Sequence, residues 1–401
     1  MERALKKAKT LDLYKGRAKF IDDRTITVAL NASEEEVCIS GVKILIAAGG
    51  RPFVPTVSGL EDAGYLTSET FFGPQFPEKP WSKLILIGGG PIGCEFAHIF
   101  SAAGTKVTVV QKRSRLAAKE EPEISKMLQE QLRRDGVEVL LSQTASSVVE
   151  KGGQKQLTIT SKTGTKRRIS ADAIFVSSGI RSNGDRLGLE AAGVAIDARG
   201  WIVTDEYLKT SVPHIYALGD INGKFQFRHK ANYEADILIH NLFSGTRKKR
   251  SAHYNIVPWA IFTHPQIAHV GMTEAEALKT GKRIQVGKNF YSMTAYGYAM
   301  GYEPNDPDDG FVKLIADETG KILGVHIIGP HATILIQSFV YLMNAGFTCQ
   351  SRPNQLPIPH QTGSRYCLEA SSIETIDQSM VIHPALSEVV AWVTGELKWA
   401  N

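Results

Sequence analysis

"KLILIGGGPIGCEFAHIFSAAGTKVTVVQKR" (Lys83–Arg113) reads as an apolar strand at Leu84–Ile87, a glycine-rich turn, an amphipathic helix and a second strand at Val107–Val110. The turn has the spacing G-x-G-x-x-G, formed by Gly88, Gly90 and Gly93. The first glycine allows a tight bend, the second lets the backbone approach a pyrophosphate, and the third lets helix and strand pack closely. Free N–H groups at the helix N-terminus attract that pyrophosphate. A purely structural βαβ unit is the alternative, but this order of elements favours a dinucleotide site.

The end of the second strand bears on which dinucleotide is bound. A carboxylate at this point would bond the ribose hydroxyls of NAD and repel the 2′-phosphate of NADP. This chain has the neutral Gln111, followed by Lys112 and Arg113. The amide and the adjacent cations favour NADP. NAD is an open alternative, because the same cations would also occur in a turn that is simply exposed to solvent.

Composition and cysteine spacing restrict the class of protein. A chain of 401 residues predicts two or three domains, and its net charge of +5 does not favour nucleic-acid binding. No apolar run approaches the roughly eighteen residues that a membrane helix needs, and the charged N-terminus is not a secretory signal. No C-x-x-C or zinc-ligand pattern is formed by Cys38, Cys94, Cys349 and Cys367. We therefore expect a cytoplasmic protein without a membrane span and without a metal site.

A second glycine-containing strand end follows later in the chain. In "IYALGDINGK" (Ile215–Lys224) an apolar strand ends at Gly219 and Asp220. A carboxylate placed there can bond a sugar or ribityl hydroxyl of a ligand, although Gly-Asp alone is usually only a turn. "AAGGRP" (Ala47–Pro52) is another strand end with consecutive glycines, and the pairing of the two favours a second ligand site.

Seven stretches occur in a characteristic order: "IAAGGRP", "IGGGPIGCEFA", "VSSGIRSN", "TSVPHIYALGD", "FTHPQIAHVGMTEAEA", "GVHIIGPHA" and "HPALSE". Together they resemble the class I pyridine nucleotide-disulfide oxidoreductases, the FAD-dependent family of dihydrolipoyl dehydrogenase, glutathione reductase and mercuric reductase. The chain is most similar to the dihydrolipoyl dehydrogenase-like members. The resemblance implies electron transfer between NAD(P)H, FAD and a dithiol or disulfide substrate, which is small or protein-bound.

The resemblance also implies an α/β fold with two Rossmann-like nucleotide-binding domains, the FAD-type one incomplete, and an α+β C-terminal dimerisation domain. We expect the partial FAD-type domain at residues 1–79 and 200–251, the NAD(P)-binding domain at 80–199 and the dimerisation domain at 252–401. In the last domain "GFVKLIADETGKILGVHIIG" (Gly310–Gly329) predicts two antiparallel strands around a turn at Glu318–Gly320.

Carried over to this sequence, the family pattern assigns roles to single residues. Glu95 would lie near the contact of nicotinamide and flavin, and Asp220 would bind the ribityl chain. The helix that begins in "RHKANYEA" (Arg228–Ala235) would direct its positive end to the flavin pyrimidine. The remaining positions implied at the cofactors are Ala48, Gly49, Gly179, Gly219, Lys230 and Ala231.

His383 and Glu388 would be the acid–base pair, reaching into the active site of the partner subunit of a homodimer. Pro384 suits the first helical position, because its missing N–H costs nothing there. A carboxylate on one ring nitrogen fixes the tautomer and raises the basicity of the imidazole. A plain capped surface helix is the alternative that these residues alone leave open.

The chain departs from the family pattern before residue 88, where no other G-x-G-x-x-G occurs and Cys38 has no neighbouring cysteine. We therefore expect an N-terminally incomplete member, isolated with little FAD and without disulfide turnover of its own. Residues 349–379 match the family poorly and are expected to form a loop. A mercuric reductase-like enzyme and a catalytically inactive nucleotide-binding dimer are the alternative functions.

Overall fold

The computed structural model describes residues 5, 7–33, 35–73, 75–245, 249–254, 256–344, 371–373, 386, 389–390 and 392–400. The chain divides into two compact units. Met1–Phe53 and Ile180–Tyr254 form the first unit, and Val54–Gly179 and Asn255–Asn401 form the second. The division into three domains with boundaries near residues 80, 200 and 252 stays a prediction.

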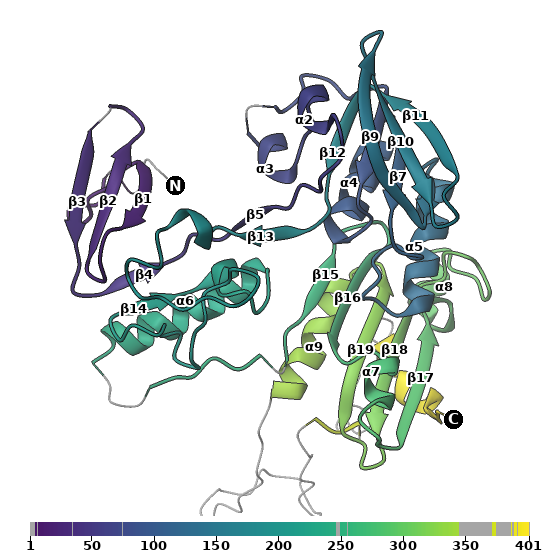
Figure 1. Cartoon of the computed structure of the whole chain (residues 1–401). Coiled ribbons are helices and arrows are strands. Elements are labelled where there is room, and N and C mark those ends of the chain that lie inside the picture. Colours follow the sequence, from purple (N-terminus) through teal and green to yellow (C-terminus); the bar gives the residue numbers. More distant parts are fainter. Residues whose placement is uncertain are drawn as a thin grey trace, which may run out of the picture. The chain divides into compact units, whose positions relative to one another are not determined.

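The first unit contains a three-stranded antiparallel sheet in the order β1-β2-β3, the parallel pair β14-β4 and the antiparallel pair β13-β5 (Figure 1). Its apolar core gathers Phe20, Ile44, Ile46, Ile215 and Ala217 from these strands. Its elements are β1 (Gly16–Phe20), β2 (Thr25–Leu30), β3 (Glu36–Ser40), β4 (Ile44–Ile46), β5 (Gly50–Pro52), β13 (Ile180–Ser182), η1 (Gly184–Arg186), β14 (Ile215–Ala217), η2 (Gly219–Asn222) and α6 (Arg228–Phe243).

The second unit begins with a four-stranded parallel sheet in the order β12-β6-β7-β8. Leu84, Ile85, Leu86 and Ile87 of β6 are all buried, the pattern of a parallel strand covered on both faces. The elements of this part are α2 (Leu60–Ala63), α3 (Ser68–Phe71), β6 (Lys83–Ile87), α4 (Pro91–Ala102), β7 (Lys106–Gln111), α5 (Pro122–Arg134), β8 (Glu138–Leu141) and β12 (Ala173–Val176).

A three-stranded antiparallel sheet in the order β11-β10-β9 joins β8 to β12 along the chain. Its strands are β9 (Gln143–Lys151), β10 (Gln154–Ser161) and β11 (Lys166–Ala171). Leu157 and Ile159 of β10 pack into the same apolar cluster as Ile85 and Ile87 of β6. The small sheet is therefore part of the nucleotide-binding region and not a separate body.

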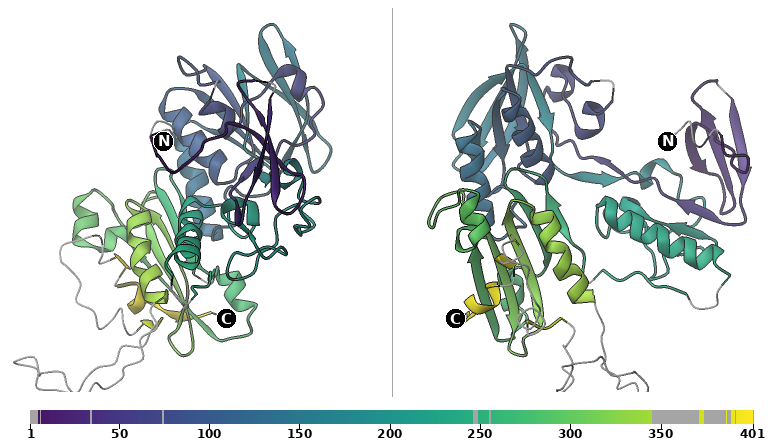
Figure 2. Two further views of the ribbon diagram at one scale, coloured as in Figure 1. Left: turned by 90° about the vertical axis from the view of Figure 1, so that its left-hand side faces the viewer. Right: turned by 180° about the vertical axis from the view of Figure 1, so that it is seen from behind.

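The C-terminal part of the second unit is a six-stranded antiparallel sheet in the order β15-β16-β19-β18-β17-β20, with α9 packed on β16 and β19 (Figure 2). The hairpin predicted at Gly310–Gly329 is confirmed, since β18 and β19 pair around it. The elements are β15 (Trp259–Ile261), β16 (Gln266–Gly271), α7 (Glu274–Leu278), β17 (Ile284–Phe290), η3 (Tyr291–Met293), α8 (Ala295–Ala299), β18 (Phe311–Asp317), β19 (Ile322–Gly329), α9 (Ala332–Asn344), η4 (Trp392–Glu396) and β20 (Lys398–Trp399).

One apolar cluster runs from the parallel sheet into the C-terminal sheet. Leu84, Phe96 and Phe175 belong to it together with Ile267 and Ile328. The predicted α/β class, with its antiparallel C-terminal sheet, is confirmed. In the described part of the chain, no helix has the length and apolar character required to span a membrane.

Candidate functional site

The glycine turn between β6 and α4 has the shape predicted for it. Gly88 has a φ of 115°, and a Cβ at this position would lie 2.5 Å from the Ser177 carbonyl oxygen. A Cβ on Gly93 would collide with the carbonyl oxygen of Gly88. Both positions therefore require glycine, one for the bend and one for the close packing of helix against strand.

Gly90 has the opposite surroundings, because a Cβ there would meet no atom within 4 Å. Gly90 is the N-cap of the twelve-residue helix α4, and Pro91 follows it. Because glycine has no side chain, no side-chain hydrogen bond caps the helix. The N–H groups and the positive dipole end of α4 thus adjoin open space. The binding of a pyrophosphate at Gly90 stays a prediction.

Gln111 ends β7 beside this turn. Its buried amide donates a hydrogen bond from Nε2 to the Arg115 carbonyl oxygen at 3.3 Å, and the same Nε2 lies 3.3 Å from where a Cβ on Gly89 would be. Lys112 and Arg113 follow with exposed side chains. The structure thus brings the amide and the start of the cationic turn to the glycine loop, as the sequence predicts.

Glu95 lies on α4 and connects it to the C-terminal part of the second unit. Its Oε1 accepts a hydrogen bond from the backbone N–H of Phe262 at 2.9 Å. Burial raises the pKa of Glu95, and the bond from Phe262 offsets only part of this increase. Gly179, with a φ of 119°, follows β12 at the boundary of the unit. Their roles at the nicotinamide stay predictions.

The candidate flavin residues lie in the first unit. Gly49 and Gly219 have positive φ angles of 64° and 76°, and Asn183 Nδ2 donates to the Ala48 carbonyl oxygen at 2.8 Å. A Cβ on Gly219 would lie 3.6 Å from the Cβ of Ala231. The two strand ends that carry these glycines, β4 and β14, are hydrogen-bonded neighbours. The structure therefore joins the two glycine-containing strand ends that the sequence paired.

Asp220 is half-buried, and burial raises the pKa of its carboxyl group. Among the described residues its carboxylate makes no hydrogen bond or ion pair, although Lys230 lies near enough to lower its pKa electrostatically. A partly desolvated carboxylate to which no described residue donates fits a ligand hydroxyl, which would supply a donor.

Lys230 is held by protein atoms. Its buried ammonium group donates to the Gly219 carbonyl oxygen at 2.9 Å and to Asn222 Oδ1 at 2.6 Å, and it pairs with Glu234 at 3.1 Å. Burial lowers its pKa, while Glu234 counteracts that shift. These contacts tie η2 to α6 and thereby position Gly219 and Asp220.

Sequence reasoning missed Glu234, the centre of this polar cluster. Its fully buried carboxylate accepts hydrogen bonds from Gly219 N and Asn222 Nδ2, each at 2.7 Å, and from the Tyr254 hydroxyl at 2.5 Å. The spacing of four residues between Lys230 and Glu234 was the available signal, because it places both on one helix face.

The predicted acid–base pair, His383 and Glu388, lies outside the described residues, and so do Cys349 and Cys367. Both described cysteines are free: Cys38 is exposed and Cys94 is buried. Burial raises the pKa of the Cys94 thiol to about 12. Cys94 is therefore unsuited to dithiol chemistry.

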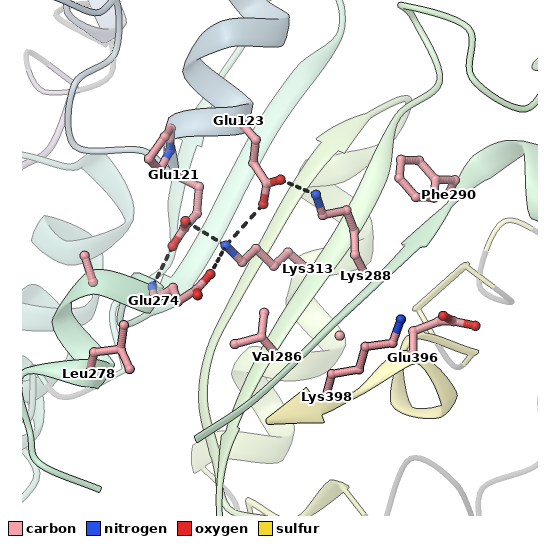
Figure 3. Close-up of a pocket in the computed structure, with 13 residues that line it drawn as sticks. Glu121, Glu123, Glu274, Leu278, Val286, Lys288, Phe290, Lys313, Glu396 and Lys398 are labelled. Carbon is pink, nitrogen blue, oxygen red and sulfur yellow. Dashed lines mark hydrogen bonds and ion pairs between the residues drawn. The ribbon is translucent and has the colours of Figure 1, made fainter. Parts of the chain in front are cut away.

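A charged pocket of about 750 Å³, which the sequence did not indicate, lies where α5 meets the C-terminal sheet (Figure 3). Buried Lys313 of β18 bonds to Glu121 at 2.9 Å, Glu123 at 3.1 Å and Glu274 at 2.6 Å, and Lys288 pairs with Glu123. The pocket is lined by Glu121, Pro122, Glu123, Glu274, Ala275, Leu278, Val286, Gly287, Lys288, Phe290, Lys313, Glu396 and Lys398.

Comparisons with known proteins agree with the geometry. Residues 2–235 match the pyridine nucleotide-disulphide oxidoreductase family, and residues 257–366 match the dimerisation domain of that family. The chain is 34% identical over 328 residues to dihydrolipoyl dehydrogenase of Rhizobium etli, covering 82% of this chain and 66% of that protein. It is 34% identical over 340 residues to mercuric reductase of Lysinibacillus sphaericus, covering 84% and 59%.

The same similarity holds in three dimensions. The HOCl-induced flavoprotein disulfide reductase RclA of Escherichia coli superposes with a TM-score of 0.80 at 26% identity, over 98% of this chain and 81% of that one. In sequence, the chain spans about two thirds of the length of the Rhizobium etli dihydrolipoyl dehydrogenase. The family uses FAD and NAD(P)H. With both family regions matched over most of its length, the chain belongs to the pyridine nucleotide-disulphide oxidoreductases.

Proposed function

We propose that this chain supplies the NAD(P)H site, part of the flavin site and the dimerisation domain of a dihydrolipoyl dehydrogenase-like oxidoreductase. The observation that carries the proposal is the open space over Gly90 at the N-terminus of α4. A pyrophosphate placed there would accept hydrogen bonds from the first N–H groups of the helix. Lys112 and Arg113, exposed beyond β7, favour the 2′-phosphate of NADP.

The flavin part of the proposal rests on Asp220. Its carboxylate would accept hydrogen bonds from ribityl hydroxyls, and the buried cluster of Lys230, Asn222 and Glu234 would hold it in place. FAD bound there would supply the electron transfer between nicotinamide and dithiol. Glu95, bonded to Phe262, would line the nicotinamide side.

His383 and Glu388 would exchange the proton of the dithiol in the partner subunit, with Glu388 orienting the imidazole. This role requires a homodimer, and the match to the dimerisation domain of the family supports one. The substrate would be a small or protein-bound dithiol or disulfide, and the chain would act in the cytoplasm, where cysteines stay reduced.

Two alternatives differ in what the nucleotide site serves. A mercuric reductase-like enzyme is supported by relatives of that name at the same level of identity. A nucleotide-binding dimer without catalysis is supported by the described cysteines, which are Cys38, exposed, and Cys94, buried with a raised pKa.

Anaerobic mixing of the purified chain, FAD in excess and NADPH or NADH tests the proposal. We expect the flavin absorbance to fall, faster with NADPH, and no disulfide turnover by these residues alone. Asp220→Asn should slow the fall by about tenfold or more, because it removes a charged acceptor of roughly 1.5–3 kcal/mol. Exposed Asp62→Asn is the control. Nucleotide binding without any loss of flavin absorbance would instead establish the inactive dimer, and failure to bind nucleotide would contradict the proposal altogether.

A further inference from the structure

Glu120, His269 and His326 come from three distant segments and meet in the interior of the second unit. One ligand atom from each lies within 4.8 Å of the other two. His269 on β16 and His326 on β19 are directly opposite in the antiparallel register, with ring centroids 5.1 Å apart. Glu120, just before α5, brings its Oε2 to 2.8 Å from His269 Nδ1.

Two polar atoms of this cluster are buried without a hydrogen-bond partner in the described structure, Glu120 Oε1 and His326 Nδ1. The residues that carry them are 2% and 0% exposed. Buried polar atoms in folded proteins are nearly always hydrogen-bonded, so two unpaired ones at one place call for a ligand.

The surroundings of His326 determine which of its two ring nitrogens carries the proton. Its Nε2 lies 2.9 Å from the Met272 carbonyl oxygen, which only accepts, so Nε2 carries the proton and Nδ1 keeps its lone pair. A backbone carbonyl on the second ring nitrogen is the usual outer partner of a histidine that binds metal.

The charge balance points to a cation. The buried ammonium group of Lys313 already bonds to Glu121, Glu123 and Glu274. Within the described ranges, the Glu120 carboxylate has no lysine or arginine partner, and its only hydrogen bond is to the His269 ring. A buried carboxylate beside two imidazoles offers the oxygen and nitrogen ligands that zinc binds at about 2.0–2.2 Å.

We propose that Glu120, His269 and His326 bind one divalent transition-metal ion of the zinc class, which fastens the segment before α5 to the C-terminal sheet. The ion replaces the proton shared by Glu120 and His269, and it supplies the partner that Glu120 Oε1 and His326 Nδ1 lack. Small side-chain rotations bring the three ligand atoms to the separation of about 3.4 Å that tetrahedral zinc requires. A site of this kind is independent of nucleotide binding.

Zinc titration of the metal-stripped, full-length chain against a chromogenic chelator tests the site. We expect one tight site per chain. Glu120→Gln and His269→Gln should each weaken it by more than about 100-fold, beyond the loss caused by removing only an outer hydrogen-bond partner. His214→Gln is the matched control, because His214 also contacts a carboxylate, Asp23, and its side chain is 14% exposed against 13% for His269. The control should keep the wild-type affinity.

Two further measurements distinguish this site from zinc bound by cysteines and from misfolding. Cobalt at the proposed site should give visible bands without a thiolate charge-transfer band, and metal-free variants should match the circular dichroism of the wild type. Zinc should also raise the melting temperature of the wild type and of His214→Gln, but not that of Glu120→Gln or His269→Gln. Equal affinity in all variants, a thiolate band, or no tight zinc binding would each overturn the proposal.

Discussion

Cys94 lies four residues beyond Gly90 on α4, but its side chain is fully buried. Its thiol points to the Gly89 carbonyl oxygen at 3.6 Å. Burial is the main reason that the pKa of this thiol rises to about 12, so the reactive thiolate form is strongly disfavoured near neutral pH. We predict that iodoacetamide alkylates exposed Cys38 in the folded protein and leaves Cys94 unmodified until unfolding, as peptide mass spectrometry would show. Equal rates at the two cysteines would contradict the buried position.

Lys112 and Arg113 test the choice of nucleotide. Replacing both by glutamine should weaken NADPH binding by about tenfold, since charge-assisted contacts to a phosphate are worth roughly 1.5–3 kcal/mol before screening by solvent. NADH affinity should change by less than about twofold, because NADH lacks the 2′-phosphate. The matched control replaces Lys279 and Lys321, which are exposed in the C-terminal part of the second unit. Calorimetric titration that finds NADPH and NADH affected alike would refute the preference for NADP.

How much of each site was predictable differs from residue to residue. Gly88, Gly90 and Gly93 were predictable because their roles follow from local backbone geometry. The cluster of Glu120, His269 and His326 was not, because its members are far apart in sequence and adjoin only after two sheets fold. The expectation of no metal site rested on cysteine spacing, which is silent about such ligands.

At the scale of elements, the turn from β18 to β19 is stabilised by one carboxylate. Burial alone would raise the pKa of Asp317, but hydrogen bonds from Thr319, Lys282 and Lys321 outweigh it and lower the pKa to about 2. A lowered pKa stabilises the fold above the unfolded value of 3.8, and this contribution is lost as the pH falls towards about 2. Because the turn adjoins solvent, we expect only about 1 kcal/mol.

Asp317→Asn should therefore lower the free energy of unfolding by about 1 kcal/mol at pH 7, and the difference should vanish as the pH approaches 2. Urea denaturation across this pH range is the measurement, with exposed Asp306→Asn as the control. A stability difference that stays constant with pH would show that the carboxylate charge is irrelevant.

Elements with a strong local pattern were placed well by sequence. The strand expected at Leu84–Ile87 is β6 (Lys83–Ile87), and the one expected at Val107–Val110 is β7 (Lys106–Gln111). Sheet order was not accessible, because the neighbours of β6 are β12 and β7, and β12 comes more than eighty residues later. The ion cluster around Lys313 was hidden for the same reason, since a lysine in an apolar strand gives no sign of its partners.

For the whole molecule, the outer face of α9 is the candidate for subunit contact. Ile334 and Tyr341 are seven residues apart, so they share one helix face, and each is 69% exposed. Exposed apolar side chains in a dimerisation domain indicate an isologous interface. We predict a dimer for the wild type and a monomer for Ile334→Glu combined with Tyr341→Glu, measured by light scattering at micromolar concentration.

Val42→Glu provides the control for this prediction, because Val42 is 82% exposed in the other unit. This variant should stay dimeric. A monomeric wild type, or a double variant as dimeric as the wild type, would place the contact elsewhere.

Nucleotide binding at the glycine loop is tested most directly at Gly90. Gly90 and Gly395 share two features: neither has a positive φ, and a Cβ on either meets nothing within 4 Å. The fold therefore has room for a Cβ at both positions, while only at Gly90 would the valine side chain lie where the proposed pyrophosphate binds. Calorimetric titration with NADPH should show affinity reduced by at least about 100-fold in Gly90→Val and unchanged in Gly395→Val. Wild-type affinity in a folded Gly90→Val protein would contradict the assignment of the site.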